Sequence, residues 1–394
     1  MKKFLSITLF IFIIIIDNFY NLYSQKLEKK FNITGYFSFL NTSLIVDSFN
    51  NQWINTNILH NRVNGNINFS NQLDLKLEIR NRFFYGDLNN SSFANNINEY
   101  GIDKGLIDLT WNIRSGKSYL LNSTVDRFYF AYKKSNLEIT VGRQRINWGQ
   151  TNVWNPNDLF NVFSYFDFDY PERPGSDAIR IQYYTGILSH IDFALKTDSS
   201  GSITSALLYR FNKNKYDIQL IGGILENNDW VGGIGWSGNI LNIGYKGEIS
   251  YFYPFNNGNN KSQTLLASMA FDYMFSNSIM LQIEMFYKYK EKIKNLNFFH
   301  YYNKPLNVKD LSFAKWNFFT QISYPFTDLV NGSLVFMCFP DQKMYFLGPS
   351  ISTTFSDNFE FMFYLQYFKG DFQILSDYEI KNILLSFIRF KYSF

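Results

Sequence analysis

The sequence predicts an all-β protein, a transmembrane antiparallel β-barrel of eighteen strands without a plug domain. Three observations lead to this prediction. Apolar and polar side chains alternate along most of the 394-residue chain, tight turns alternate with long loops, and the first residues have the layout of an export signal. A period of two gives a strand one apolar and one polar face, as a wall between lipid and a wet lumen requires.

The N-terminus predicts a secretory signal peptide over residues 1–24. Two lysines precede an apolar run from Phe4 to Ile16, and polar residues then lead to the small residue Ser24. This run is shorter than the roughly 18 apolar residues of a membrane-spanning helix, so we expect cleavage after Ser24. Residues 25–394 would then form the barrel.

The composition argues against several other classes of protein. The 37 Lys+Arg and 33 Asp+Glu residues give a formal net charge of only +4, which does not favour a nucleic-acid partner. A single cysteine, Cys338, allows neither a disulfide framework nor a cysteine-based zinc site. No metal-ligand spacing links His60, His190 and His300, and we expect no metal and no cofactor.

The alternation is clearest at residues 73–80 and 279–289, where every second residue is apolar and charged residues lie between. A soluble β-sandwich also alternates, but it would need a dry core on the face where these charges recur. A lipid-embedded barrel has no such need, because its lumen is wet. The eighteen candidate strands begin near residues 32, 52, 72, 119, 137, 176, 188, 202, 215, 229, 241, 262, 278, 312, 329, 343, 358 and 380.

The connections support the strand count independently. Those after even-numbered strands are tight, whereas those after odd-numbered strands include all the long ones. Bacterial barrels have short periplasmic turns, longer outer loops and an even number of strands, so both termini should face the periplasm. Sixteen strands also fit, if a pair around Gly232 to Gly238 is miscounted. The tight turns are expected at 134–136, 185–186, 212–214, 276–277, 327–328 and 356–357, and the long loops at 87–117, 150–175, 291–311 and 369–378.

The last predicted strand alternates up to a terminal aromatic residue, Phe394. This pattern resembles the C-terminal signature by which outer-membrane proteins are presented to the barrel assembly machinery. We therefore expect the outer membrane of a Gram-negative bacterium, with the lipid bilayer and lipopolysaccharide around the barrel. A homo-oligomer is also compatible with the sequence.

A motif begins within the fifth predicted strand: Gly142-Arg-Gln144, then Trp148-Gly149, then Asn155-Pro-Asn-Asp158. It resembles the pattern of poorly characterised porin-like outer-membrane families and, more distantly, of alginate-export-type barrels. The resemblance covers residues 126–184. It implies an outer-membrane barrel with a distinctive third outer loop, and it does not identify a solute.

Arginines on neighbouring strands predict a pore constriction. Simple alternation would point Arg143 and Arg145 at lipid, at a cost of about 2–4 kcal/mol each near the midplane. A β-bulge at Gly142 would turn them inward, and otherwise they lie in the headgroup zone. The cations expected at the constriction are Arg80, Arg82, Arg127, Arg143, Arg145 and Arg180.

The third outer loop carries acidic residues that can face these cations. Opposed charges across a narrow gap create a transverse field that favours small polar or charged solutes. Alternatively, acids and arginines pair only to pin the loop at the rim, or the carboxylates hold Ca²⁺, although their spacing matches no standard calcium loop. The acids are Asp158, Asp167, Asp169 and Glu172, with Asp177 at the end of the loop.

The function predicted is thus a porin-like channel for passive passage of small polar solutes, and not an enzyme. The rival interpretation is a lipid-modifying enzyme built on Ser189, His190 and Asp192. His190 and Asp192 lie two residues apart on a strand, roughly 6–7 Å, too far for a direct orienting hydrogen bond. A surface adhesin or assembly factor is a third class, and only the loops 87–117 and 291–311 are long enough to serve it.

Overall fold

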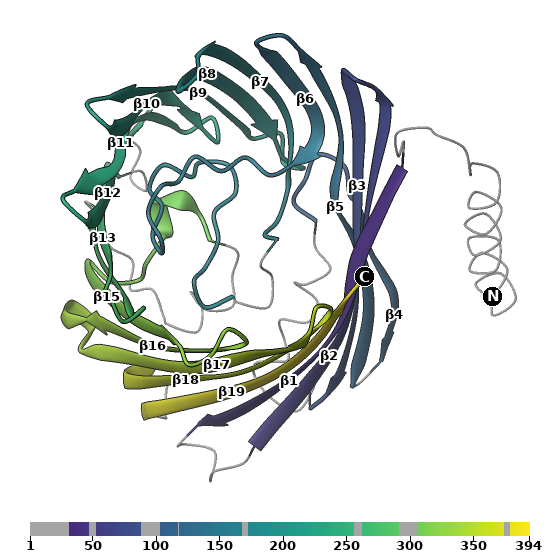
Figure 1. Ribbon diagram of the computed structural model, residues 1–394, viewed down its shortest axis with the longest axis vertical. Helices are drawn as coiled ribbons and strands as arrows, with labels where there is room; N and C mark the ends of the chain where they lie inside the picture. Colours follow the sequence, from purple (N-terminus) through teal and green to yellow (C-terminus); the bar gives the residue numbers. More distant parts are fainter. Residues whose placement is uncertain are drawn as a thin grey trace, which may run out of the picture.

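The computed structural model describes residues 31–46, 53–87, 103–116, 118–167, 172–255, 262–290, 306–373 and 379–394. The predicted signal peptide lies outside the described residues. Seen down its axis, the chain forms a closed β-barrel (Figure 1). No helix in the described part of the chain is long and apolar enough to cross a membrane.

Eighteen antiparallel strands close the ring, as predicted, because β1 pairs with both β2 and β19. The first half consists of β1 (Phe31–Val46), β2 (Trp53–Ser70), β3 (Leu73–Gly86), β5 (Tyr119–Lys134), β6 (Leu137–Gln144), β7 (Ser176–Gly186), β8 (Ser189–Thr197), β9 (Ile203–Lys213) and β10 (Tyr216–Leu225). The second half consists of β11 (Asp229–Ile240), β12 (Ile243–Pro254), β13 (Thr264–Met274), β14 (Met280–Lys290), β15 (Trp316–Pro325), β16 (Val330–Phe339), β17 (Met344–Ser356), β18 (Phe359–Gln373) and β19 (Glu379–Ser393).

One further strand, β4 (Thr110–Gly116), is not part of the ring. It pairs with β5 at residues 119–124, beyond the part of β5 that pairs with β6. The sequence pattern predicts a long loop at residues 87–117 instead. It becomes a strand because β6 ends at Gln144 and leaves the free edge of β5 to be paired, as an exposed backbone edge requires.

The connections sort by length between the two ends of the barrel. Tight connections at one end, the turn end, include 71–72, 135–136, 214–215 and 357–358, whereas the long connections lie at the other end, the loop end. One turn is displaced from its prediction, because β7 continues to Gly186 and residues 187–188 form the turn. Ile187 and Leu188 are apolar residues at a fully exposed tip, so the alternation hides this turn.

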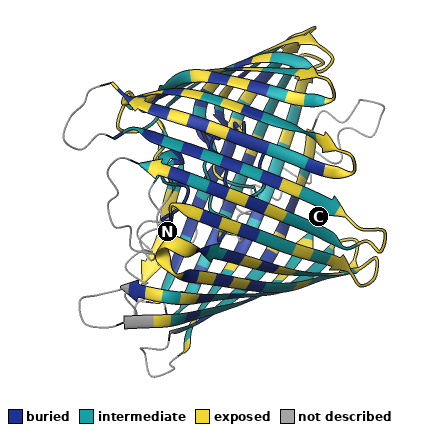
Figure 2. Ribbon diagram, turned by 90° about the vertical axis from the view of Figure 1, so that its left-hand side faces the viewer, coloured by how far each residue is buried: buried dark blue, intermediate teal, exposed yellow. Residues whose placement is uncertain are grey.

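The outer wall carries apolar side chains around the barrel, and Figure 2 shows exposed and buried residues alternating along the oblique strands. Outward residues include Phe37, Leu59, Ile249 and Phe336, each more than a third exposed. These side chains form the surface that a lipid-facing wall requires.

The inner wall has two different halves. On β2, β3 and β5 it is charged, with Arg62, Arg80 and Asp126 buried. On β12 to β19 it is mixed, because Phe252 and Phe368 have no exposed surface and the same is true of the polar residues Glu248, Glu284 and Gln366. The expectation of a polar lumen wall is therefore wrong for the apolar part of this second half. Its side chains stay dry because two chain segments fold into the barrel and pack on them.

The first of these segments, residues 145–167, is called the inward loop, and it crosses the interior between β6 and β7 (Figure 1). The second is residues 306–315, with the short 3-10 helix η2 (Val308–Asp310), called the second segment. Trp154 of the inward loop and Leu311 of the second segment belong to one apolar cluster with the wall. The lumen is thus partly filled by a hydrophobic core.

Candidate pore constriction

Two buried glutamates on the wall hold the inward loop by its backbone. Glu248 of β12 and Glu284 of β14 have no exposed surface. Their carboxylates accept hydrogen bonds from successive backbone N–H groups of residues 150–157. The donors are Gln150, Thr151 (3.0 Å) and Asn157 (2.9 Å) to Glu248, and Asn152 (2.9 Å), Val153 (3.0 Å) and Trp154 (2.8 Å) to Glu284. Such charge-assisted bonds are about twice as strong as neutral ones.

The side chains of the Gly-Arg-Gln motif region anchor the same loop. The indole Nε1 of Trp148 donates to Asp192 on β8 at 2.9 Å. Asn157 donates through Nδ2 to the carbonyl of Ile234 at 3.1 Å and accepts from the hydroxyl of Ser250 at 2.7 Å. These contacts join the loop to β8, β11 and β12, so this part of the motif defines the course of the loop.

Aromatic rings seal the loop onto the apolar half of the wall. Trp154 stacks on Phe286 at a centroid distance of 5.6 Å. Phe166 meets Phe346 and Phe368 edge to face, both at 5.3 Å. Because these rings are closely packed, they leave little passage for water between the loop and β14 to β18.

The charged half of the wall faces the opposite side of the loop. Arg62 of β2 forms ion pairs with Glu78 and Asp126, and Arg80 lies 3.3 Å from the same aspartate. Arg82 donates to the side-chain oxygen of Asn122 at 2.9 Å. Arg62 is not among the predicted cations, although it occupies an alternating polar position of its strand and the same pattern could have found it.

A β-bulge in β5 brings two neighbouring charges into the lumen. The register with β3 shifts between Glu78 and Ile79, so that Asp126 is the extra residue and both it and Arg127 are buried inside. Arg127 donates to the backbone carbonyls of Glu172 and Arg173, both at 2.7 Å. The strand wall thereby holds the end of the third outer loop.

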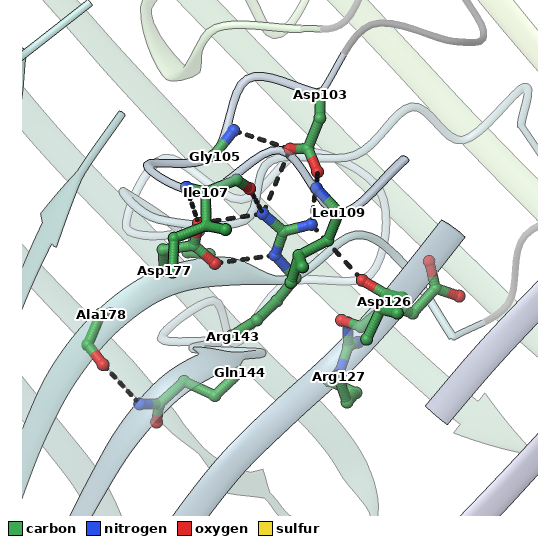
Figure 3. A network of polar contacts seen from close by, with 12 residues as sticks. Asp103, Gly105, Ile107, Leu109, Asp126, Arg127, Arg143, Gln144, Asp177 and Ala178 are labelled. Carbon is green, nitrogen blue, oxygen red and sulfur yellow. Dashed lines mark hydrogen bonds and ion pairs between the residues drawn. The ribbon is translucent and has the colours of Figure 1, made fainter. Parts of the chain in front are cut away.

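Arg143 does not line the lumen, contrary to the prediction. No register shift occurs at Gly142, and the guanidinium is buried beneath residues 103–109 (Figure 3). It donates to Asp177 at 2.7 and 2.9 Å, to Asp103 at 2.6 and 3.2 Å, and to the carbonyl of Ile107 at 2.7 Å. Burial disfavours the charged form of Asp103, but hydrogen bonds from Arg143 and backbone N–H groups outweigh it and lower the pKa of that carboxyl.

The remaining predicted cations lie inside the barrel. Arg180 of β7 donates to both carboxylate oxygens of Asp192, with distances between 2.5 and 3.0 Å. Arg145 opens the inward loop and lines the lumen cavity beside Arg127. Electrostatic interaction links Arg145 to Asp158 and Arg173 of the loop.

The predicted loop acids occupy three different environments. Asp158 is only 1% exposed, and burial, followed by the charge of Glu248, raises its pKa to about 8. Asp167 is exposed, and Asp169 lies outside the described residues. Glu172 lies 4.0 Å from Arg62 across the ion-pair network. The acids that the structure describes therefore do not form one row opposite the arginines.

A cavity of about 710 Å³ remains between the charged wall and the loop, on the turn-end side. Five cationic and four anionic side chains line it. A space of this size and polarity is suited to a small hydrated solute. The charged lining consists of Lys76, Arg127, Lys133, Arg145, Arg180, Asp74, Glu78, Glu138 and Glu172.

The residues of the rival enzyme interpretation are engaged elsewhere. Asp192 is fully buried and accepts from Trp148 and Arg180, while Ser189 accepts from the hydroxyl of Thr185 at 2.8 Å. His190 packs against Tyr184 at a centroid distance of 5.7 Å. Within the described residues, no three His, Cys, Asp or Glu side chains gather into a metal site.

The other two histidines and the cysteine also have assigned places. His60 is 2% exposed and meets Tyr36 edge to face at 5.2 Å. His300 lies outside the described residues. Cys338 is half-buried on β16, where it is opposite Phe318 and Tyr345.

Comparison with known proteins gives the fold its context. No family model and no curated protein matches the chain. Solved structures do match: OccAB3 of Acinetobacter baumannii (10% identity, 92% of this chain and 100% of that chain, TM-score 0.58), OccK11 (OpdR) of Pseudomonas aeruginosa (10%, 94% and 99%, 0.57) and a BenF-like porin from Pseudomonas fluorescens Pf-5 (10%, 93% and 98%, 0.57). The chain therefore has the fold of an eighteen-stranded porin barrel over nearly its whole length.

Proposed function

We propose that this protein is an outer-membrane channel that passes small polar or charged solutes passively and without catalysis. The single observation that carries this proposal is the polar cavity left beside the inward loop. One side of the lumen is sealed by packed aromatic rings, whereas the other side is lined by ionised groups. A wet, charged passage within an otherwise dry barrel conducts hydrated solutes and rejects apolar ones.

The charged wall favours anions modestly. The cavity lining has five cations against four acids. Further cations, Arg80 and Arg82, lie along the same wall near the buried acid Asp126. Fixed charges in a narrow, partly desolvated passage are weakly screened, so a small excess is sufficient for a measurable preference.

The membrane setting belongs to the same proposal. We place the barrel in the outer membrane of a Gram-negative bacterium, with lipopolysaccharide and phospholipid around its apolar wall and the barrel assembly machinery as its insertion partner. A homo-oligomer is compatible with this wall. Residues 142–158 would then mark a family of porin-like barrels that share this loop anchor, with alginate-export-type barrels as distant relatives.

Planar-bilayer recording of the purified protein tests the proposal. We expect stepwise conductance with a reversal potential that indicates anion preference, together with uptake of small polar solutes by proteoliposomes. Heat-denatured protein is the control for detergent artefacts. The channel proposal would be wrong if the protein showed no conductance steps. If it also hydrolysed lipids and His190→Ala abolished this hydrolysis, the protein would be an enzyme.

A further inference from the structure

The outer wall is not uniformly apolar, because the outward face of β2, β3 and β5 carries polar side chains. Asn61 of β2 is adjacent to the lumen residue Arg62 and shares the outward face of Leu59, which is 48% exposed. Asn81 of β3 lies directly opposite Asn61, and Ser123 of β5 lies directly opposite Asn81. These three side chains on neighbouring strands are called the amide row.

The amide row lies within the apolar band and not at the rim of the barrel. On β3 the outward neighbours of Asn81 are Ile79 and Phe83. The ring of Phe83 contacts that of Tyr85 at a centroid distance of 5.5 Å, so two aromatic residues separate the row from the loop end of this strand. By contrast, the centres of the outward faces of β12, β14 and β16 carry the apolar side chains Ile249, Ile283, Met285, Leu334 and Phe336.

Hydrogen bonds within the barrel satisfy only part of the amide row. The hydroxyl of Ser123 donates to Asn81 at 2.7 Å, and Nδ2 of Asn81 donates to Oδ1 of Asn61 at 3.2 Å. Nδ2 of Asn61 donates to the backbone carbonyl of Tyr36 at 3.3 Å. A carboxamide has two N–H donors, and in the described part of the chain each of these asparagines uses one. Acyl chains offer no acceptor for the second donor, so a polar partner at this depth is favoured over lipid.

A groove of about 500 Å³ hollows the same face of the barrel. Its lining includes both asparagines of the amide row together with Phe37 of β1, Phe83 of β3 and Phe390 of β19. Protein interfaces combine packed aromatic side chains with a small number of hydrogen bonds. The groove and the amide row supply both on one surface.

We propose that the outward face of β18, β19, β1, β2, β3 and β5, called the amide face, binds a second copy of this chain within the membrane. Carboxamides both donate and accept hydrogen bonds, so two identical amide faces are self-complementary, as a symmetric interface requires. Copies in one membrane share one orientation, and a symmetry axis along the membrane normal therefore brings the two amide rows together at the same depth. This inference rests on the membrane setting of the proposed function, but not on conduction.

The amide face is large enough for such an interface. Its strands are consecutive neighbours in the ring. Strands lie about 4.8 Å apart and the apolar band of a barrel is about 25 Å tall, so the central four strands present roughly 480 Å² and all six roughly 720 Å². Stable interfaces begin at roughly 600 Å² per partner. Most of the amide face must therefore take part, including the aromatic residues of β18 and β19.

Thiol crosslinking in native membranes is the first test. Leu59→Cys, made in a Cys338→Ala background, places one thiol on the amide face, and a bifunctional maleimide should convert this variant into a product of twice the protomer mass. Ile249→Cys in the same background is the matched control, because Ile249 is 37% exposed on β12, across the barrel from β2 and β3 (Figure 1). Equal yields of dimer from both positions, or no dimer from Leu59→Cys, would refute the interface. A crosslinked product of any other mass would assign the face to a different partner and overturn the inference as well.

Native mass spectrometry of protein extracted in a mild detergent tests the amide row itself. Wild-type protein should give a dimer. Asn61→Leu combined with Asn81→Leu should raise the dimer dissociation constant at least about tenfold, which corresponds to about 1.4 kcal/mol, because leucine is compatible with lipid but forms no hydrogen bond. Thr320→Leu is the control, since Thr320 is a polar residue that shares the outward face of Phe318 and Ile322 on β15. Heat-modifiable migration verifies that both variants fold, and an unchanged dimer in the double variant would contradict the role of the amide row.

Conductance separates this inference from the proposed function. A protein that forms crosslinked dimers through Leu59→Cys but conducts no ions would retain the interface and refute the channel. A protein that conducts in planar bilayers but gives no crosslinked product in membranes would retain the channel and refute the interface.

Discussion

The indole nitrogen of Trp148 lies 2.9 Å from a carboxylate oxygen of Asp192, and this hydrogen bond joins the start of the inward loop to β8. Asp192 also receives the guanidinium of Arg180. One buried acid thus fixes both a loop and a lumen cation. The contact explains why Asp192 is not available to orient His190, and it connects the loop position to the charge of the bore.

Charge selectivity should depend on the arginines of the lumen wall. Replacing Arg82 and Arg180 by Ala should decrease the anion-to-cation permeability ratio several-fold, because a fixed charge in a narrow passage is worth on the order of 1 kcal/mol for a passing ion. Reversal potentials in a salt gradient measure this ratio. Lys215→Ala, in an exposed turn, should leave it unchanged, since rim charges are screened within about 8 Å at physiological salt. If the reversal potential of the double variant equals that of the wild type, the two arginines have only a structural role.

The acid at the end of the third loop should act in the opposite direction. Glu172 lines the cavity and lies 4.0 Å from Arg62. Glu172→Gln should therefore increase anion preference. The increase should be smaller than the decrease expected for the double variant of Arg82 and Arg180. Recordings at two ionic strengths distinguish a constriction from a rim effect, because only the latter fades at high salt. A decrease in anion preference would contradict the placement of this carboxylate.

The clamp around Arg143 should make a large contribution to stability. Arg143→Ala leaves the buried carboxylates of Asp103 and Asp177 without their cation, which costs about 3 kcal/mol or more for a broken buried pair. Urea unfolding in detergent, followed by tryptophan fluorescence, measures the loss. Lys133→Ala removes a pair with Glu138 in which the lysine is 55% exposed, and we expect about 0–1 kcal/mol there. Equal effects for both variants would show that residues 103–109 need no anchor.

The clamp around Arg143 should also lose stability at low pH, because Asp103 becomes protonated. Its pKa is lowered in the folded protein, so the folded state binds this proton less readily than the unfolded chain. The stabilisation is present above the ordinary aspartate range and disappears as pH falls through the lowered value. Asp103→Asn should therefore flatten the decline of the unfolding free energy below about pH 4. If the unfolding free energy of the variant declines at low pH as it does in the wild type, other carboxylates cause the decline.

Asp158 should produce the opposite pH dependence. Its pKa is raised to about 8 from an ordinary 3.8, so between these values the folded protein holds a proton that the unfolded chain has released. The free energy of unfolding then falls as pH rises through this interval. Asp158→Asn should be nearly neutral at pH 5 and stabilising by at least about 1.4 kcal/mol at pH 9. If Asp158→Asn is destabilised equally at both pH values, the carboxylate of Asp158 is ionised in the folded wild-type protein.

Backbone geometry predicts a strong preference for glycine at position 142. Gly142 has a φ of 121°, and an added Cβ would lie 2.3 Å from the carbonyl oxygen of Phe128. Gly142→Ala should cost about 1–3 kcal/mol, measured by the same urea unfolding. Gly222 has nothing within 4 Å of an added Cβ and is the control, because Gly222→Ala meets open space. Similar stabilities of the two variants would contradict the backbone conformation at Gly142.

The strand pattern is predictable from the sequence because alternation and turn residues are local properties. The count of eighteen strands follows from residues such as those at 73–80 without any knowledge of their partners. The turn at residues 187–188 was misplaced because Ile187 and Leu188 continue the apolar pattern. The strand β4 was missed because its pairing depends on where β6 ends, which is a tertiary property.

The candidate site was predictable only in part, for the same reason. Arg80 and Arg127 could be placed in the lumen by counting positions on a strand. The clamp of Arg143 depends on Asp103, a residue 40 positions away in the chain. Glu248 and Glu284 act on a loop about 100 or more positions distant, and nothing in their local sequence marks a buried acid that accepts backbone donors.

Part of the lumen is occupied by packed side chains, with Trp148, Phe252 and Phe346 almost or fully inaccessible to water. The number of strands sets the circumference of such a barrel, but the free cross-section is set by what folds inside it. Permeability and wall architecture are therefore separate properties in this molecule. In the proposed channel, shortening the inward loop would change the size limit for solutes without altering a single strand, so the same scaffold can be adapted to new solutes by changes confined to one internal segment.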